Sequence, residues 1–205
     1  MSTAPAAAAA PEAKTERKDI YIGYAGTFDA SSLKDGTTKT DKPYASAVLV
    51  VSDDKKVTVS AFSADGIAAL KAAVASKAPT IIQGYLADAP GFMNLHKVGA
   101  SEYTGELANV QSGPGGEGKM AYFDAILKAN GDRKFPIVLK AFGDAAAALA
   151  SAANGDKLTV EGYAQRVTAG AGEEAGYRSG AQVTKLVSLE PAAKKAAEVD
   201  DSPSP

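Results

Sequence analysis

The 205-residue sequence contains no cysteine, a single histidine and no long apolar run. The lack of cysteine excludes disulfides, thiolate metal sites and cysteine nucleophiles, and it is typical of a reducing compartment, so we expect a cytoplasmic location. No run approaches the ~18 apolar residues of a membrane-spanning helix, and no membrane association is expected. His96 is the one pivot for a histidine-based metal site or a Ser-His-Asp set, and no carboxylate lies at ligand spacing from it. No metal site is predicted.

An excess of positive charge is also missing. The formal net charge is −2, and residues 20–189 contain 17 basic and 17 acidic side chains. Proteins that bind nucleic acid usually carry an excess of Lys and Arg, because these side chains contact phosphates. A nucleic-acid-binding face on this chain would therefore have to segregate its charges.

Both ends of the chain lack the pattern of a folded segment. The alanines of residues 1–18 follow no basic residue, so a disordered arm is favoured over a secretory signal. From Glu190 onward the sequence has no apolar periodicity and ends in an acidic stretch, which predicts a disordered tail.

Between these ends, the first half reads as five strands with one helix between the third and the fourth. A polar loop, 29–43, is expected after the first strand. This order is that of the five-stranded oligonucleotide/oligosaccharide-binding (OB) barrel. The predicted strands are Ile20 to Phe28, Tyr44 to Val51, Lys56 to Phe62, Thr80 to Leu86 and Phe92 to Val98, and the predicted helix is Asp65 to Ser76.

The second half repeats the first at an offset near 79 residues, which is long enough for a complete barrel. We therefore predict two tandem OB-fold domains, all-β with one helix each, over residues 19–99 and 100–190, with tails 1–18 and 191–205. The short linker near 99–102 should hold the barrels against each other. The matched anchors are Tyr24 and Tyr103, Ala47 and Ala125, Ala61 and Ala141, and Gly84 and Gly162.

Two loops distinguish the copies. The first copy has the longer loop between strands one and two, 29–43, and the second has the longer loop between strands four and five, 168–180. These two loops flank the binding groove of an OB barrel, so the copies are expected to differ in what they bind.

One segment, 134–166, contains a strand with Phe135, the turn Phe142-Gly143, a helix from Ala145 to Ala153 capped by Asp144, and a strand that runs from Gly155-Asp156 to Glu161-Gly162. These features resemble bacterial-type single-stranded DNA-binding proteins. In that family an aromatic strand leads through a Phe-Gly turn into a helix, and an acidic-Gly strand follows a Gly-Asp or Gly-Ser turn.

The resemblance implies a non-catalytic protein without a cofactor that coats single-stranded DNA in replication, recombination or repair, in a bacterial cell or a phage-infected host. It implies four barrels per assembly, which a two-barrel chain reaches as a homodimer. It also implies that the acidic tail, with Glu198, Asp200 and Asp201, recruits replication or recombination proteins. The tail ends in Pro205 rather than in the apolar tip on which that recruitment depends.

The strongest signal for an enzyme is the stretch from Gly113 to Lys119, which fits the G-x-x-x-x-G-K pattern of a phosphate loop. Met120 stands where the loop needs Ser or Thr, and Ala121 to Lys128 reads as a strand rather than as the helix whose amides would hold phosphate. A hairpin loop is favoured, and no enzymatic activity is predicted.

Exposed rings that stack on bases, together with Lys and Arg along the backbone, carry the binding hypothesis. Strand alternation turns Tyr44 and Tyr122 outward. Phe135 matches a stacking position of the family, although alternation with Ile137 and Leu139 favours the core unless Pro136 introduces a bulge. The residues that begin the helical turns, Phe62 and Phe142, are expected in the core. The predicted contacts are Tyr44, Lys55, Lys56, Tyr122, Lys128, Arg133, Lys134, Phe135, Lys140, Arg166, Tyr177 and Arg178.

Single-stranded DNA binding is therefore the leading hypothesis, with the second barrel as the main grip. The competing hypothesis is a tandem-barrel scaffold for proteins that binds no nucleic acid, and the near-neutral charge favours it.

Overall fold

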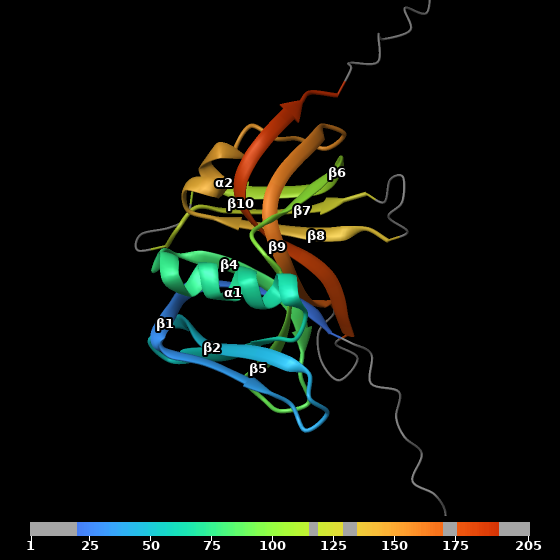
Figure 1. Ribbon diagram of the computed structural model, residues 1–205. Helices are drawn as coiled ribbons and strands as arrows, with labels where there is room; N and C mark the ends of the chain where they lie inside the picture. The colour runs from blue at the N-terminus through green and yellow to red at the C-terminus, as the bar shows by residue number, and fades with distance from the viewer. Residues whose placement is uncertain (1–19, 115–118, 129–134, 170–175, 193–205) are drawn as a thin grey trace, which may run out of the picture.

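The computed structural model describes residues 20–114, 119–128, 135–169 and 176–192. Within these ranges the chain forms ten strands and two helices, arranged as two barrels that lie one above the other in Figure 1. Arg133 and Lys134, both tails and the centre of the loop at 168–180 lie outside the described residues.

The first barrel closes in the order β1-β2-β3-β5-β4, with β4 returning to pair with β1. All its neighbours are antiparallel except β3 and β5, which are parallel. Buried Ala45, Ala47 and Leu49 alternate with half-buried residues along β2, as expected for a strand with a core face and an outer face. The strands are β1 (Tyr21–Thr37), β2 (Pro43–Ser52), β3 (Lys55–Ala61), β4 (Thr80–Leu86) and β5 (Phe92–Val98).

The predicted loop 29–43 is mostly strand, because β1 continues to Thr37. The extension follows a bulge between Asp29 and Lys34, and pairing with β2 resumes beyond it. Ser32 stabilises the bulge, since its hydroxyl donates to the Asp29 carbonyl and accepts from the Val48 N–H at 2.8 Å. Polar residues can form this hairpin because the part of β1 beyond the bulge is exposed on both faces.

One end of the first barrel is covered by α1 (Ala64–Ser76), close to the predicted helix. The Ser63 hydroxyl caps the helix by accepting from the Gly66 N–H at 3.1 Å, and Lys77 ends it in the left-handed conformation. Leu70 and Val74 on α1 are buried in the core with Leu49 and Ile82.

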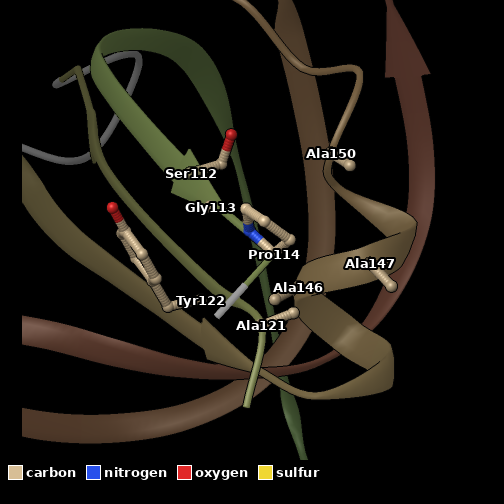
Figure 2. A pocket seen from close by; sticks show the side chains of 8 residues that line it. All are labelled: Ser112, Gly113, Pro114, Ala121, Tyr122, Ala146, Ala147 and Ala150. Carbon is tan, nitrogen blue, oxygen red and sulfur yellow. The ribbon is translucent and has the colours of Figure 1, made fainter. Parts of the chain in front are cut away.

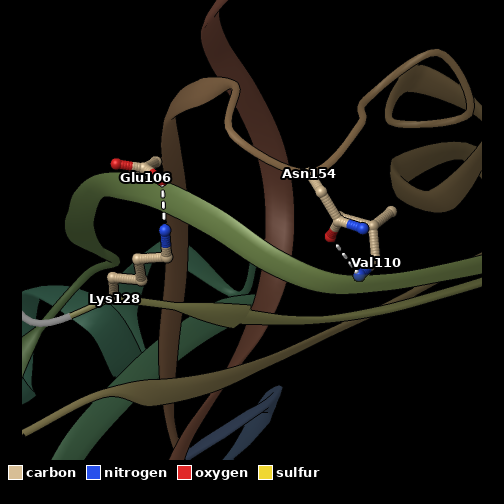
Figure 3. Close-up of polar contacts among 4 residues, drawn as sticks. All are labelled: Glu106, Val110, Lys128 and Asn154. Atoms are coloured by element: carbon tan, nitrogen blue, oxygen red, sulfur yellow. Dashed lines mark hydrogen bonds and ion pairs between the residues drawn. The ribbon is translucent and has the colours of Figure 1, made fainter. Parts of the chain in front are cut away.

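The second barrel repeats this plan, closing in the order β6-β7-β8-β10-β9, with β8 and β10 as the parallel pair. Its strands are β6 (Ser101–Gly113), β7 (Tyr122–Leu127), β8 (Ile137–Phe142), β9 (Lys157–Ala169) and β10 (Gly176–Glu190). The strand β6 carries a bulge between Ala108 and Gln111, where the Val110 N–H donates to the Asn154 side chain at 2.9 Å (Figure 3). A bulge held by a side chain therefore occurs in the same strand of both barrels.

The helix of the second barrel differs from the prediction. It is α2 (Asp144–Ala148), which ends five residues before Ala153, and its N-cap is Gly143 with no side-chain cap, so the assignment of Asp144 as the cap is wrong. Gly143 has a positive φ of 58°, which favours glycine at this turn. Leu149 follows the helix and is buried in the core with Phe123 and Leu158.

The anchors of the sequence repeat occupy equivalent places in the two barrels. Gly84 on β4 and Gly162 on β9 each face a backbone carbonyl of the next strand. A Cβ would lie 2.1 Å from the Asn94 oxygen at Gly84 and 2.3 Å from the Gln182 oxygen at Gly162. Only glycine permits this approach of two backbones.

The hairpin of β9 and β10 is much longer than that of β4 and β5 and reaches from the second barrel toward the first (Figure 1). The predicted loop 168–180 is correspondingly shorter, since β9 extends to Ala169 and β10 begins at Gly176.

Gly99 and Ala100 alone separate β5 from β6, and the barrels pack together as the short linker predicts. The fully buried amide of Gln83 connects them. Its nitrogen donates to the Gly99 carbonyl at 3.0 Å and to the Ser101 hydroxyl at 2.8 Å, while its oxygen accepts from the Ala164 N–H at 3.1 Å. One side chain on β4 therefore fixes both the linker and β9.

Candidate nucleic-acid interface

The outer face of the first barrel carries a pair of rings where β2 and β3 meet. Alternation along β2 turns Tyr44 outward, and Phe62 follows Ala61 on the outward side of β3. The two ring centroids lie 6.2 Å apart, and Phe62 is 49% exposed. The Tyr44 ring covers Gly36 on β1, where a Cβ would lie 2.9 Å from a ring carbon. We call Tyr44 and Phe62 the first ring pair.

The second barrel presents the same arrangement. Tyr122 pairs with Phe142 across β7 and β8, and these side chains are 40% and 45% exposed. The Tyr122 ring covers Gly113 on β6, where a Cβ would lie 2.6 Å from a ring carbon. Tyr122 and Phe142 form the second ring pair, in which an aromatic side chain again covers the bare backbone of a neighbouring glycine.

The expectation that Phe62 and Phe142 belong to the core is wrong. Val59 and Ala61 on β3, like Leu139 and Ala141 on β8, point inward, so the next residue in each strand points outward. Strict alternation would have predicted this exposure, whereas proximity to the helical turn misled the interpretation. The same parity, read from buried Met93, turns Phe92 outward beside Thr58, and this ring too is absent from the predicted contacts.

Phe135 lies before β8 begins and is 74% exposed, so the alternation of β8 does not extend to it. Of the two alternatives for Phe135, a stacking position and a place in the core beside Ile137 and Leu139, this exposure excludes the core. Phe135 is therefore a further exposed ring at the edge of the second barrel.

Two of the predicted phosphate contacts are paired with carboxylates. The Lys128 ammonium pairs with Glu106 on β6 (Figure 3), and the Lys140 ammonium lies 3.4 Å from Asp124 on β7. These pairs lie on the outer surface of the second barrel, where they reduce its positive potential. Exposed pairs of this kind stabilise a fold by only about 0–1 kcal/mol, so a stronger anion can compete for the lysines.

Two predicted cations from different barrels line one cavity at the junction. Lys55, at the start of β3, and Arg166, on β9, both border a space of about 310 Å³, together with Tyr24 and Tyr163. The Lys55 ammonium lies 4.4 Å from the centre of the Tyr24 ring, a cation–π contact. Burial raises the pKa of both Tyr24 and Tyr163, which keeps these phenols neutral. The junction therefore brings together charges that lie more than a hundred residues apart in sequence.

The remaining predicted contacts are not gathered there. Lys56 is exposed on the outer side of β3 opposite Val50, and it helps to lower the pKa of Asp29, for which the hydrogen bonds from Ser31 are the larger cause. Arg178 is exposed on β10 opposite Val167. The backbone of Tyr177 pairs with Thr168, and its side chain lies outside the described residues.

The alternatives that the sequence raised find little support in the described residues. The residues after Lys119 form β7, as expected, and not the helix that a phosphate loop requires. His96 packs edge-on against Tyr21 and Tyr85, with ring centroids 5.7 and 6.0 Å apart. Across the described ranges, no three His, Asp or Glu side chains gather as a metal site would require, and no helix has the length and apolar character to span a membrane.

No protein-family model and no curated protein sequence matches the chain. Among solved structures, a deletion mutant of the single-stranded DNA binding protein from Thermus aquaticus matches with 12% identity and a TM-score of 0.38, covering 87% of this chain and 97% of that one. The wild-type Thermus aquaticus protein matches with 12% identity and a TM-score of 0.35, covering 87% and 95%. The function proposed below depends on neither match, because both TM-scores are low.

Proposed function

We propose that this chain is a non-catalytic single-stranded DNA-binding protein built from two tandem OB-fold barrels. The observation that carries the proposal is the repeated ring pair: Tyr44 with Phe62, and Tyr122 with Phe142, at the same cross-strand position on the outer face of each barrel. Exposed rings stack on unpaired bases at about 1–3 kcal/mol per base, and stacking needs no particular base sequence.

The junction cavity supplies the charge that the ring pairs lack. Lys55 and Arg166 line one cavity between the barrels, and the proposal assigns to this cavity the phosphates of the bound DNA strand. Phe92, which is not among the predicted contacts, adds an exposed ring to the first barrel.

The same proposal includes two domains, 19–99 and 100–190, a homodimer and a cytoplasmic location. It also includes recruitment of replication or recombination proteins by residues 191–205. Roles in replication, recombination or repair follow from the family resemblance. Light scattering on the full chain distinguishes a homodimer from a monomer.

The experiment that tests the function is a titration of fluorescently labelled oligo-dT by anisotropy, with a duplex of equal length as the control. We expect tight binding to oligo-dT, weak binding to the duplex, and a log–log salt slope of about −0.7 per phosphate neutralised. Lys55→Ala and Arg166→Ala should each make that slope shallower by about 0.7, the contribution of one neutralised phosphate. The absence of any anisotropy change at low salt and micromolar protein would contradict the proposal.

A second function, a scaffold that binds proteins and no nucleic acid, is favoured by the carboxylates that pair with Lys128 and Lys140. Under that function the salt slope vanishes along with oligo-dT binding. The same titration therefore separates the two functions.

A further inference from the structure

A pocket of about 450 Å³ opens beside the second ring pair, between the ends of β6 and β7 and the helix α2. Figure 2 shows Tyr122 on one side, Ala146, Ala147 and Ala150 on the other, and Pro114 between them, with Ser112 at the rim. The volume lies within the range of small-molecule sites, roughly 300–1,000 Å³.

In the first barrel, larger side chains stand at the equivalent place. Gly36 pairs with Tyr44 as Gly113 pairs with Tyr122, so Asp35 is the counterpart of Ser112. Each helical segment contributes one fully buried leucine, Leu70 within α1 and Leu149 directly after α2. Aligning these two leucines makes Lys71 the counterpart of Ala150 and Ile67 the counterpart of Ala146. Lys71 and Asp35 form an ion pair at 3.0 Å, and Ile67 packs against the core beneath it.

Small residues in the second barrel replace each part of this arrangement. Alanine stands where Ile67 fills the space and where Lys71 bridges to β1, and a serine replaces the carboxylate. Because the first barrel shows that the fold accommodates the larger residues, the pocket is a property of the second barrel and not of the architecture.

The lining selects for a flat and neutral occupant. Among the described residues, the lining contains no Asp, Glu, Lys or Arg side chain. It offers alanine methyls and an aromatic ring, and its polar side-chain atoms are the hydroxyls of Ser112 and Tyr122. Burying a charged group there without a partner would be unfavourable. A nucleobase fits this description, since its faces are apolar and its edge forms hydrogen bonds.

We propose that this pocket binds one nucleobase of the bound DNA strand. This base points away from the second ring pair into the pocket, where it lies against Tyr122 and contacts the methyls of Ala147 and Ala150. This rests on the proposed function and adds that one base is held more deeply than its neighbours, in the second barrel alone. Tyr122 then serves both the ring pair and the pocket.

The test compares two leucine substitutions on adjacent exposed residues of α2. Ala147→Leu fills the pocket, whereas Ala148→Leu adds the same side chain outside it. We expect Ala147→Leu to weaken binding of an oligo-dT about tenfold, as the loss of one stacked base predicts, and Ala148→Leu to leave it unchanged. A set of oligo-dT strands with one abasic site each should include, for the wild type, a position with an about tenfold loss that Ala147→Leu abolishes and Ala148→Leu retains.

A direct readout is the methyl spectrum of the alanine-labelled full chain. Ring-current shifts of the Ala147 and Ala150 methyls on adding an oligonucleotide that contains adenine support the proposal. Equal oligo-dT affinities of Ala147→Leu and Ala148→Leu, with unshifted methyls, overturn it and leave the proposed function standing. A wild type that binds no oligonucleotide overturns both.

Discussion

The first barrel is covered by the thirteen-residue helix α1 with Ile67, Leu70 and Val74, whereas the second has the five-residue α2, made of Asp144 and four alanines. The second barrel instead extends its last two strands, β9 and β10, into the long hairpin beside the junction. The strand order and the ring pair are the same in both barrels. The two copies therefore share the sheet and its ring pair, and they differ in the helix and in the hairpin.

Charge separates the barrels further. Lysines on the outer face of the second barrel are paired with Glu106 and Asp124, whereas Lys55 in the first lies over the ring of Tyr24. A DNA strand would therefore have to displace Glu106 and Asp124 to reach the lysines of the second barrel. At Lys55 it would meet an ammonium that lies over an aromatic ring.

The largest effect is expected from removing one ring pair at a time. Tyr122→Ala/Phe142→Ala should weaken oligo-dT binding by about 2–6 kcal/mol, since each of the two rings stacks at about 1–3 kcal/mol. Tyr44→Ala/Phe62→Ala should weaken it less, because Tyr44 is more buried than Tyr122 and the Lys71–Asp35 ion pair stands where the second barrel has its pocket. Anisotropy titrations at one salt concentration give both values.

Tyr85→Ala is the matched control. Tyr85 is an exposed ring of the first barrel that lies on β4, whereas the first ring pair lies at β2 and β3, and it packs against Tyr21 and His96. The substitution should leave binding unchanged. Equal losses from the two double variants would show that the barrels bind alike and would remove the asymmetry.

A smaller effect, on stability, is expected at the junction. Gln83→Leu leaves the Ala164 N–H and the Gly99 carbonyl without their amide partner, which should lower the free energy of unfolding by about 1–3 kcal/mol. The repeat-related Glu161 forms an exposed pair with Lys185, so Glu161→Leu should cost less than about 1 kcal/mol. Urea denaturation measures both. A Gln83→Leu variant as stable as the wild type would mean that the amide does not hold the barrels together.

The smallest effect concerns alkaline pH. Burial, and then the nearby Tyr21, raise the pKa of Tyr103 from 10.0 to about 12. Between these values the unfolded chain releases a proton that the folded chain keeps, so stability should fall as the pH rises through this window. Tyr103→Phe should flatten that fall, and its counterpart Tyr24→Phe should flatten it less. Thermal unfolding across the window compares them, and identical profiles for wild type and Tyr103→Phe would contradict the assignment.

Local pattern predicted much of the framework. Strands β4 and β5 have the predicted bounds, because an apolar run and a Pro90-Gly91 turn mark their ends. The outward direction of Tyr44 and Tyr122 followed from the period of two. That same period would have placed Phe62 and Phe142 correctly had it been applied across the end of the strand.

Other features depend on contacts that the local sequence does not display. The polar residues after Asp29 lengthen β1 because β2 pairs with them, and no apolar alternation marks such a hairpin. The alanines of α2 carry no stripe that fixes the length of the helix. Gln83 lies between Ile82 and Gly84 on a strand covered on both faces, and only the neighbouring barrel explains why an amide is buried there.

The two-residue connection between β5 and β6 has a consequence for how the proposed function responds to strand length. Because Gln83 holds both barrels in one orientation, a DNA strand bound by one barrel would be present at a high effective concentration at the other barrel. Affinity should then rise in a step when an oligonucleotide becomes long enough to reach both ring pairs. Under the proposed function, the fixed spacing of the two ring pairs therefore sets the oligonucleotide length at which this step occurs.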